Sequence, residues 1–128
     1  MEKVPSPTKM AASAGEAAAL LKTLSNEHRL LILCYLIAED EMSVGELIAK
    51  IGLSQSALSQ HLAKLRDEGL VAFRREAQML FYRVSDDRAA SVLLLLHDMF
   101  CAAPDGAPFG KSRMANAASR RDKASEGD

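Results

Sequence analysis

The sequence has no uninterrupted apolar run of the roughly 18 to 20 residues that a membrane-spanning helix needs, so we expect no membrane association. A secretory signal is not expected either, because Glu16 and Lys22 interrupt the apolar core that would have to follow Lys3 and Lys9. Together these absences predict a cytoplasmic protein.

Cysteine is also scarce, since Cys34 and Cys101 are the two thiols of the chain. Thiols stay reduced in the cytosol, so this pair is not expected to form a permanent structural disulfide. Positive charge is not in excess, because the formal net charge is −1. A function in nucleic-acid binding must therefore depend on local clusters of Lys and Arg.

The chain has room for one domain with a modest core, because it has 128 residues, of which 48% are hydrophobic and many of those are alanine. A core of that size favours a dimer, which buries more surface. We expect a loose, disordered arm over residues 1–14, one domain over residues 15–102 and a disordered tail over residues 103–128, because both ends contain few large apolar residues. The sequence contains no internal repeat.

The stretch from residue 53 to residue 71 has the clearest helix signals in the chain. Ser54 is expected to cap the first turn through its hydroxyl, and Gly69 is expected to end the helix as a left-handed residue. The face predicted to be buried has apolar residues at spacings of four and three, namely Leu58, Leu62 and Leu65. The opposite face carries short, uncharged, hydrogen-bonding side chains, namely Gln55, Ser56, Ser59 and Gln60. Such side chains suit base edges in the DNA major groove, although helical periodicity alone favours a merely solvated face.

A short helix directly before this stretch completes a helix-turn-helix. Ser43 and Glu46 have the spacing of a capping box, and Gly52 is expected to end the short helix. Further helices are predicted from about residue 15, over about residues 27–38 and over about residues 87–102. The helix over residues 27–38 is apolar nearly all round and is expected at the centre of the core. The last helix is apolar on more than one face, which predicts a homodimer seam formed together with the first helix.

Two runs of β-forming residues follow the helix with the polar face, at residues 70–75 and 79–84. They predict an antiparallel hairpin, and the connector at residues 76–78 has no glycine, so a tight two-residue turn is not expected. The predicted fold class is therefore mainly α with a small β-hairpin, a winged helix-turn-helix with the order helix, helix, helix, helix, strand, strand, helix. Its wing carries Arg74, Arg75 and Arg83, where positive charge would meet DNA phosphates.

Several segments together resemble the ArsR/SmtB family of dimeric winged-helix repressors, namely residues 24–33, 43–47, 53–62, 65–71, 74–78 and 82–84. The resemblance spans about residues 15–102 and implies a homodimer that binds double-stranded operator DNA, with no catalytic residue and no cofactor. The candidate contacts to bases or nearby phosphates are Gln55, Ser56, Ser59, Gln60 and His61, and the candidate phosphate contacts of the wing are Arg74, Arg75 and Arg83. Two alternatives stay open: His61 as half-buried packing, and Arg83 as the partner in a structural ion pair.

Metal-sensing members of that family carry a cysteine motif at the start of the third helix, or Asp, His and Glu pairs on the last one. The corresponding segment here, residues 42–45, has no cysteine, and the last helix offers His97 and Asp98, with Asp86 and Asp87 far along it. A tetrahedral metal site needs three or four well-placed ligands. No bound metal is therefore expected, and a metal- or metalloid-responsive repressor is the alternative.

Cys34 and Cys101 resemble the sensor thiols of the persulfide-sensing, SqrR/BigR-like branch of the family. That resemblance implies that the reduced dimer binds its operator. Reactive sulfur species then join the two thiols through a disulfide or polysulfide bridge, which releases the DNA and derepresses sulfide-detoxification genes. The alternative is that Cys34 is a small buried apolar residue. His97 lies four residues before Cys101 and would favour the thiolate when protonated, whereas the nearby helix C-terminus opposes it.

Two functions from other classes fit the sequence less well. A thiol enzyme that uses Cys101 and His97 would need an acid partner and an oxyanion-binding loop, and neither is recognisable, so no enzymatic activity is expected. A non-catalytic winged-helix module for protein interaction stays open, and absence of salt-dependent DNA binding would favour it.

Overall fold

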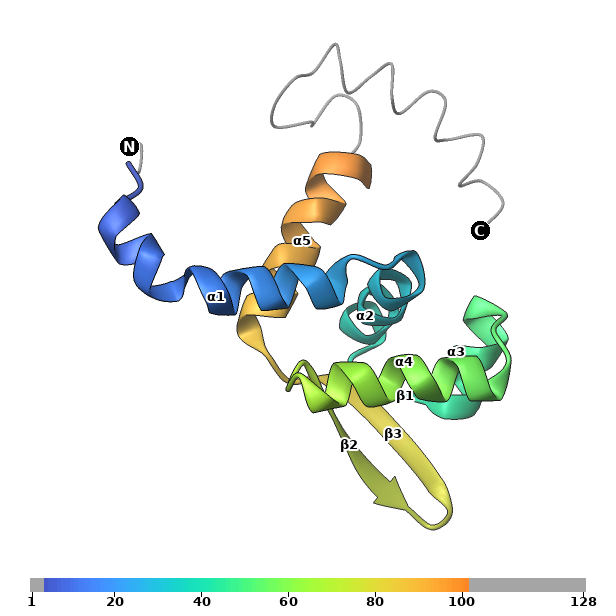
Figure 1. Cartoon of the computed structure of the whole chain (residues 1–128). Coiled ribbons are helices and arrows are strands. Elements are labelled where there is room, and N and C mark those ends of the chain that lie inside the picture. Colours follow the sequence, from blue (N-terminus) through green and yellow to red (C-terminus); the bar gives the residue numbers. More distant parts are fainter. Residues whose placement is uncertain (1–3, 102–128) are drawn as a thin grey trace. The chain divides into compact units, whose positions relative to one another are not determined.

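The computed structural model describes residues 4–101, and it has the order of elements of a winged helix-turn-helix (Figure 1). The elements are α1 (Pro7–Leu24), α2 (Glu27–Glu39), β1 (Met42–Ser43), α3 (Val44–Ile51), α4 (Gln55–Asp67), β2 (Val71–Glu76), β3 (Met79–Val84) and α5 (Asp87–Cys101). The chain divides into two compact units after Ala89, so α1 to the first turn of α5 belong to the first unit. Within the described residues, no helix has the length and apolar character to cross a membrane.

The first helix begins earlier than the sequence analysis predicted, at Pro7 rather than at about Gly15. The hydroxyl of Ser6 accepts a hydrogen bond from the backbone N–H of Lys9 at 3.3 Å. Proline suits the first helical position because its missing N–H has no partner there in any helix. The prediction of a loose arm is therefore wrong for residues 7–14, while residues 1–3 and the predicted tail at 103–128 lie outside the described residues.

The sheet has three antiparallel strands in the order β1-β3-β2. The predicted hairpin of β2 and β3 is confirmed, and its pairing runs from Val71 opposite Val84 to Glu76 opposite Met79. Strand β1 was not predicted from the sequence, because two residues are too short to show a strand pattern. It pairs with β3 and thereby joins the wing to the segment that leads into α3.

The turn at the tip of the wing corrects a second prediction. Strand pairing continues to Glu76 and Met79, so Ala77 and Gln78 alone reverse the chain. Ala77 has a φ of 57°, in the left-handed region that short hairpin turns require. A two-residue turn thus forms without glycine, because strand pairing up to Glu76 and Met79 leaves two residues for the connection.

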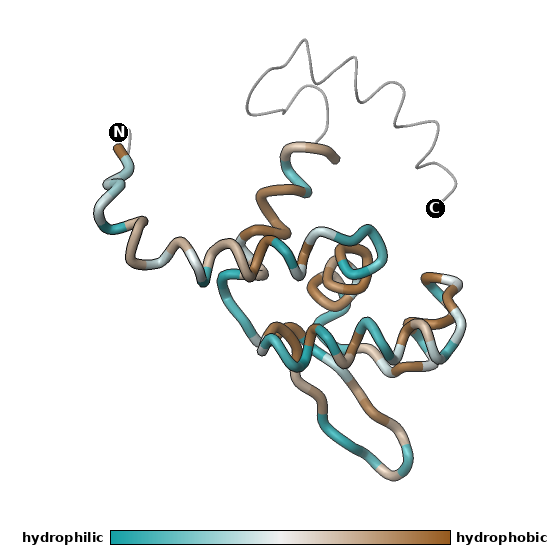
Figure 2. Tube along the Cα trace, viewed as in Figure 1, coloured by the Kyte–Doolittle hydropathy of each residue, from teal (hydrophilic) through white to brown (hydrophobic). Residues whose placement is uncertain are grey.

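Helix α2 lies at the centre of the core of the first unit and contacts α1, α3, α4, β1 and β3. Figure 2 shows its apolar residues, of which Ile32, Leu33 and Leu36 are fully buried. The other face is open, because Leu31 is 46% exposed and Cys34 is exposed as well. The sequence correctly predicted the central place of this helix, but an all-apolar run does not indicate which side faces solvent.

Candidate nucleic-acid interface

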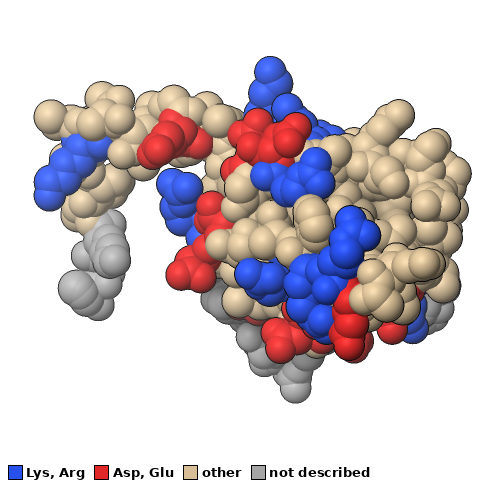
Figure 3. All heavy atoms as spheres, turned by 90° about the horizontal axis from the view of Figure 1, so that it is seen from below, with Lys and Arg blue, Asp and Glu red and all other residues tan. Residues whose placement is uncertain are grey.

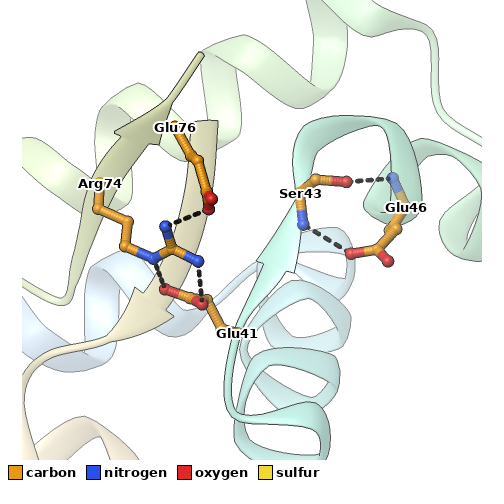
Figure 4. Close-up of polar contacts among 5 residues, drawn as sticks. All are labelled: Glu41, Ser43, Glu46, Arg74 and Glu76. Carbon is orange, nitrogen blue, oxygen red and sulfur yellow. Dashed lines mark hydrogen bonds and ion pairs between the residues drawn. The ribbon is translucent and has the colours of Figure 1, made fainter. Parts of the chain in front are cut away.

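The helix-turn-helix is defined by local contacts at each helix end. Ser43 and Glu46 form the predicted capping box of α3, with the Glu46 N–H donating to Ser43 Oγ at 3.1 Å and the Ser43 N–H donating to Glu46 Oε1 at 2.8 Å (Figure 4). Gly52, at φ 88°, ends α3, and Ser54 Oγ accepts from the Ala57 N–H at 3.1 Å to cap α4. These contacts fix where α4 begins, which sets the direction of its outer face.

The two faces of α4 separate as predicted. Its apolar stripe is buried, and its polar face is exposed and consists of Gln55, Ser56, Ser59 and Gln60. Within residues 4–101 none of these four side chains forms a hydrogen bond, so their donors and acceptors are available to another molecule. This face has the chemistry to recognise base edges.

His61 lies apart from that face and points toward α2. Its side chain is half-buried, its Nδ1 lies 3.4 Å from Nη1 of Arg29, and its ring centroid lies 5.8 Å from that of His28. Burial, followed by the charges of Arg29 and His28, lowers the pKa of His61. The arrangement favours the packing interpretation of His61 over a DNA contact.

Arg29 was not among the residues singled out in the sequence. Its Nε donates to the carbonyl oxygen of Thr23 at 2.7 Å, and the same guanidinium reaches His61. It therefore connects the end of α1, the first turn of α2 and the middle of α4. Position 29 carries no local signal for this role, because the partners come from three different elements.

The wing arginines differ from one another. Arg74 makes two hydrogen bonds to Glu41, at 2.8 and 3.1 Å, and one to Glu76 at 2.8 Å (Figure 4). Hydrogen bonds to these carboxylates raise the pKa of Arg74, and the hydrogen bond from Arg74 lowers the pKa of Glu41. The ion-pair interpretation that was open for Arg83 therefore fits Arg74, three of whose five N–H groups already bind carboxylates.

Arg75 and Arg83 are exposed, and neither forms an ion pair within the described part of the chain. Figure 3, seen from the side to which the wing points, shows Lys and Arg side chains gathered near the middle of this face with Asp and Glu beside them. The paired cations include Lys64, which lies 3.7 Å from Glu68. The charge of Arg83 also contributes to the lowered pKa of Glu41, after the larger effect of Arg74, so Arg75 is the wing arginine without a carboxylate interaction among the described residues.

The two cysteines are each exposed within their own unit. Cys34 faces outward from α2, which contradicts its interpretation as a small buried residue. Cys101 is exposed at the end of α5, four residues after the exposed His97. Among residues 4–101 no group of three or more His, Cys, Asp or Glu side chains is placed to hold a metal ion.

Comparisons with known proteins agree with this geometry. The model of the bacterial regulatory protein family arsR matches residues 26–72. The chain is 50% identical over 94 residues to the transcriptional activator HlyU of Vibrio cholerae. This alignment covers 73% of this chain and 86% of that protein. It is 47% identical over 100 residues to the biofilm growth-associated repressor of Agrobacterium fabrum, with coverage of 78% and 84%. The crystal structure of the transcriptional repressor BigR from Xylella fastidiosa superposes with a TM-score of 0.72 at 43% identity, covering 77% of this chain and all of that one.

Proposed function

This chain belongs to the ArsR family of bacterial regulatory proteins, and from that membership we propose that it is a homodimeric repressor that releases its operator when reactive sulfur bridges Cys34 and Cys101. The chain is a DNA-binding transcriptional regulator of the winged-helix type. The observation that supports a response to sulfur is the exposure of Cys34 on a helix whose other face is buried in the core.

In this proposal α4 enters the major groove and reads base edges through Gln55, Ser56, Ser59 and Gln60. Their exposure and their lack of partners within the described chain support that role. Arg75 and Arg83 bind phosphates, which position the protein without reading sequence. Two copies of α4 in a dimer would meet half-sites about 34–36 Å apart.

The homodimer forms through α1 and α5. Helix α1 exposes Met10 and Leu21, at 53% and 57%, and α5 exposes Leu94 and Leu95, at 53% and 55%. Adjacent exposed apolar side chains, such as Leu94 and Leu95, are more typical of an association site than scattered ones. A two-fold dimer presents the same surface on both copies, so these residues would be covered in a self-complementary way.

The chemistry of the switch needs a polysulfide as oxidant. One cysteine thiolate attacks a sulfane sulfur of the polysulfide, an S–S bond of the polysulfide breaks, and the shortened chain leaves as the anion. The thiolate of the other cysteine then attacks the persulfide and expels hydrosulfide, which leaves a disulfide, or a bridge with an inserted sulfur where the first product carries an additional sulfur. The two thiols are oxidised by two electrons, and sulfane sulfur is reduced to hydrosulfide.

We expect a polysulfide to release operator DNA from the wild-type protein but not from Cys34→Ser or Cys101→Ser, because each variant lacks one end of the bridge. Gel-shift assays on an inverted-repeat operator measure the release, and intact mass identifies the bridge as a loss of two hydrogens plus one sulfur for each inserted atom. A thiol reductant should restore DNA binding to the wild type alone.

The same assay separates the alternatives. Release from both serine variants would contradict the dithiol switch. Release by zinc or arsenite, with polysulfide inert, would point to a metal-responsive repressor. Absence of any salt-dependent DNA binding by the untreated protein would instead indicate a protein-interaction module.

The two neighbouring wing arginines provide a matched test of the DNA-binding surface. Arg75→Gln is expected to flatten the slope of log affinity against log salt by about 0.9, the value for one lost phosphate contact. Arg74→Gln is expected to leave that slope unchanged, because Glu41 and Glu76 already bind its guanidinium. Salt titrations of operator binding measure both, and an equal loss in the two variants would contradict the assignment.

A further inference from the structure

We propose that the groove between α4 and the wing seats one sugar–phosphate strand of the operator and that Arg66 binds a phosphate of that strand. This assignment rests on the operator-binding function proposed above. It adds Arg66 to the candidate DNA contacts on the outer face of α4 and on the wing, two of which, Gln55 and Ser59, also line this groove.

The groove has a volume of about 600 Å³. One wall is α4, and the residues along it recur at spacings of four, four and three: Gln55, Ser59, Ala63 and Arg66. The facing wall is the tip of the wing, with Gln78, Met79 and Leu80, and the end of β1 and α3 close the groove with Ser43, Val44, Gly45 and Ile48. The lining contains no Asp or Glu, and Arg66 is its cationic residue. An anionic strand would therefore meet one positive charge and no carboxylate.

Arg66 lies over an aromatic ring and has no acid beside it among the described residues. Its guanidinium carbon lies 5.6 Å from the ring centroid of Phe73 on β2. That ring packs in turn on Tyr82, with centroids 5.4 Å apart, and Tyr82 is buried. A guanidinium that contacts an aromatic face keeps its N–H groups available, and those groups match the geometry of a phosphate.

The contrast with the neighbouring basic residue on α4 sharpens this role. Lys64 lies 3.7 Å from Glu68 and does not line the groove. Arg66 forms no ion pair among the described residues. One residue separates the two cations in the sequence. Of the two, Arg66 alone lines the groove and forms no ion pair with a carboxylate among the described residues.

The apolar part of the lining also fits a nucleic-acid backbone. Met79 is 51% exposed at the wing tip, and Leu80 follows it in the lining. A DNA strand alternates anionic phosphates with deoxyribose rings, whose carbon faces can pack on such side chains. When α4 occupies the major groove, the next surface along the duplex is the backbone that separates it from the minor groove. The wing projects beyond α4 (Figure 1) and would reach that backbone.

The test compares Arg66→Gln with Lys64→Gln, which removes the same charge from the same helix. We expect Arg66→Gln to flatten the log–log salt slope by about 0.9, so that its deficit in affinity relative to wild type shrinks about 3.5-fold between about 50 and about 200 mM salt. Operator and unrelated duplex should be affected alike, since a phosphate contact carries no sequence information. Lys64→Gln should keep the wild-type slope.

Ethylation interference then locates the contact. With the wild type, ethylating particular phosphates should block binding, and at least one of these should cease to matter in Arg66→Gln. Phe73→Leu, which removes the ring under the guanidinium, should shift the slope in the same direction and by less. Thermal unfolding of each variant verifies that the fold is retained.

Three results would overturn the assignment: Arg66→Gln behaving like Lys64→Gln, a loss confined to the specific operator sequence, or an unchanged ethylation pattern. The second would make Arg66 a base contact instead. Failure of the wild type to bind any duplex would count against the proposed function itself, and so remains distinguishable from failure of this assignment.

Discussion

Replacing Leu33 by alanine is expected to lower the free energy of unfolding by about 2 to 5 kcal/mol, the range for deleting a buried leucine side chain. Leu33 has no exposed surface, and it lies on the face of α2 that forms the centre of the core. The deletion removes apolar burial and leaves a cavity that surrounding helices cannot fully close. Urea unfolding at a fixed protein concentration measures the change, because the stability of a dimer depends on concentration.

Leu31→Ala is the matched control, since it makes the same chemical change two residues away in the same helix. Leu31 is 46% exposed, so we expect it to lose less than about 1 kcal/mol. Similar losses at both positions would show that α2 is not oriented as the structure has it.

Replacing Gln55 or Gln60 by alanine is expected to weaken binding to the specific operator by about 5- to 150-fold, which corresponds to the roughly 1 to 3 kcal/mol of a good base contact. Both side chains are exposed and form no hydrogen bond with the described residues. Competition titrations with operator and unrelated DNA measure the effect, and the affinity for unrelated DNA should stay close to the wild-type value.

Alanine removes the side-chain amide without destabilising α4, because alanine favours helix more than glutamine does. The slope of affinity against salt should also stay unchanged, since no cation is removed. A uniform loss on all duplexes would place these glutamines at phosphates, and no loss would remove them from the interface.

The parts of the interface that sequence could predict are those whose determinants lie within a few residues of one another. Ser43 with Glu46, and Ser54 at the start of α4, are local caps, so the bounds of α3 and α4 followed from them. Gly69, at φ 79°, likewise ends the segment where expected. The same kind of signal was present in Ser6 and Pro7, where it marked a helix start that was assigned too late.

What sequence could not supply depends on partners that are distant along the chain. Arg74 and Glu41 are 33 residues apart, and Arg29 and His61 are 32 apart. Both contacts arise only when β1 pairs with β3 and α2 packs on α4. The exposure of Cys34 has a different cause, because its neighbours Leu33 and Tyr35 give no polar residue to mark the outer side of α2.

Arg29 ties the first turn of α2 to the end of α1 and to the middle of α4, through the Thr23 carbonyl and the His61 ring. Cys34 follows Arg29 by five residues, or roughly 7.5 Å of helix axis. Under the proposed switch, a displacement of α2 imposed by a bridge at Cys34 would reach α4 through this contact and through the packing of α2 on α4. The helix that carries Gln55 and Ser59 would thus respond to sulfur without touching it.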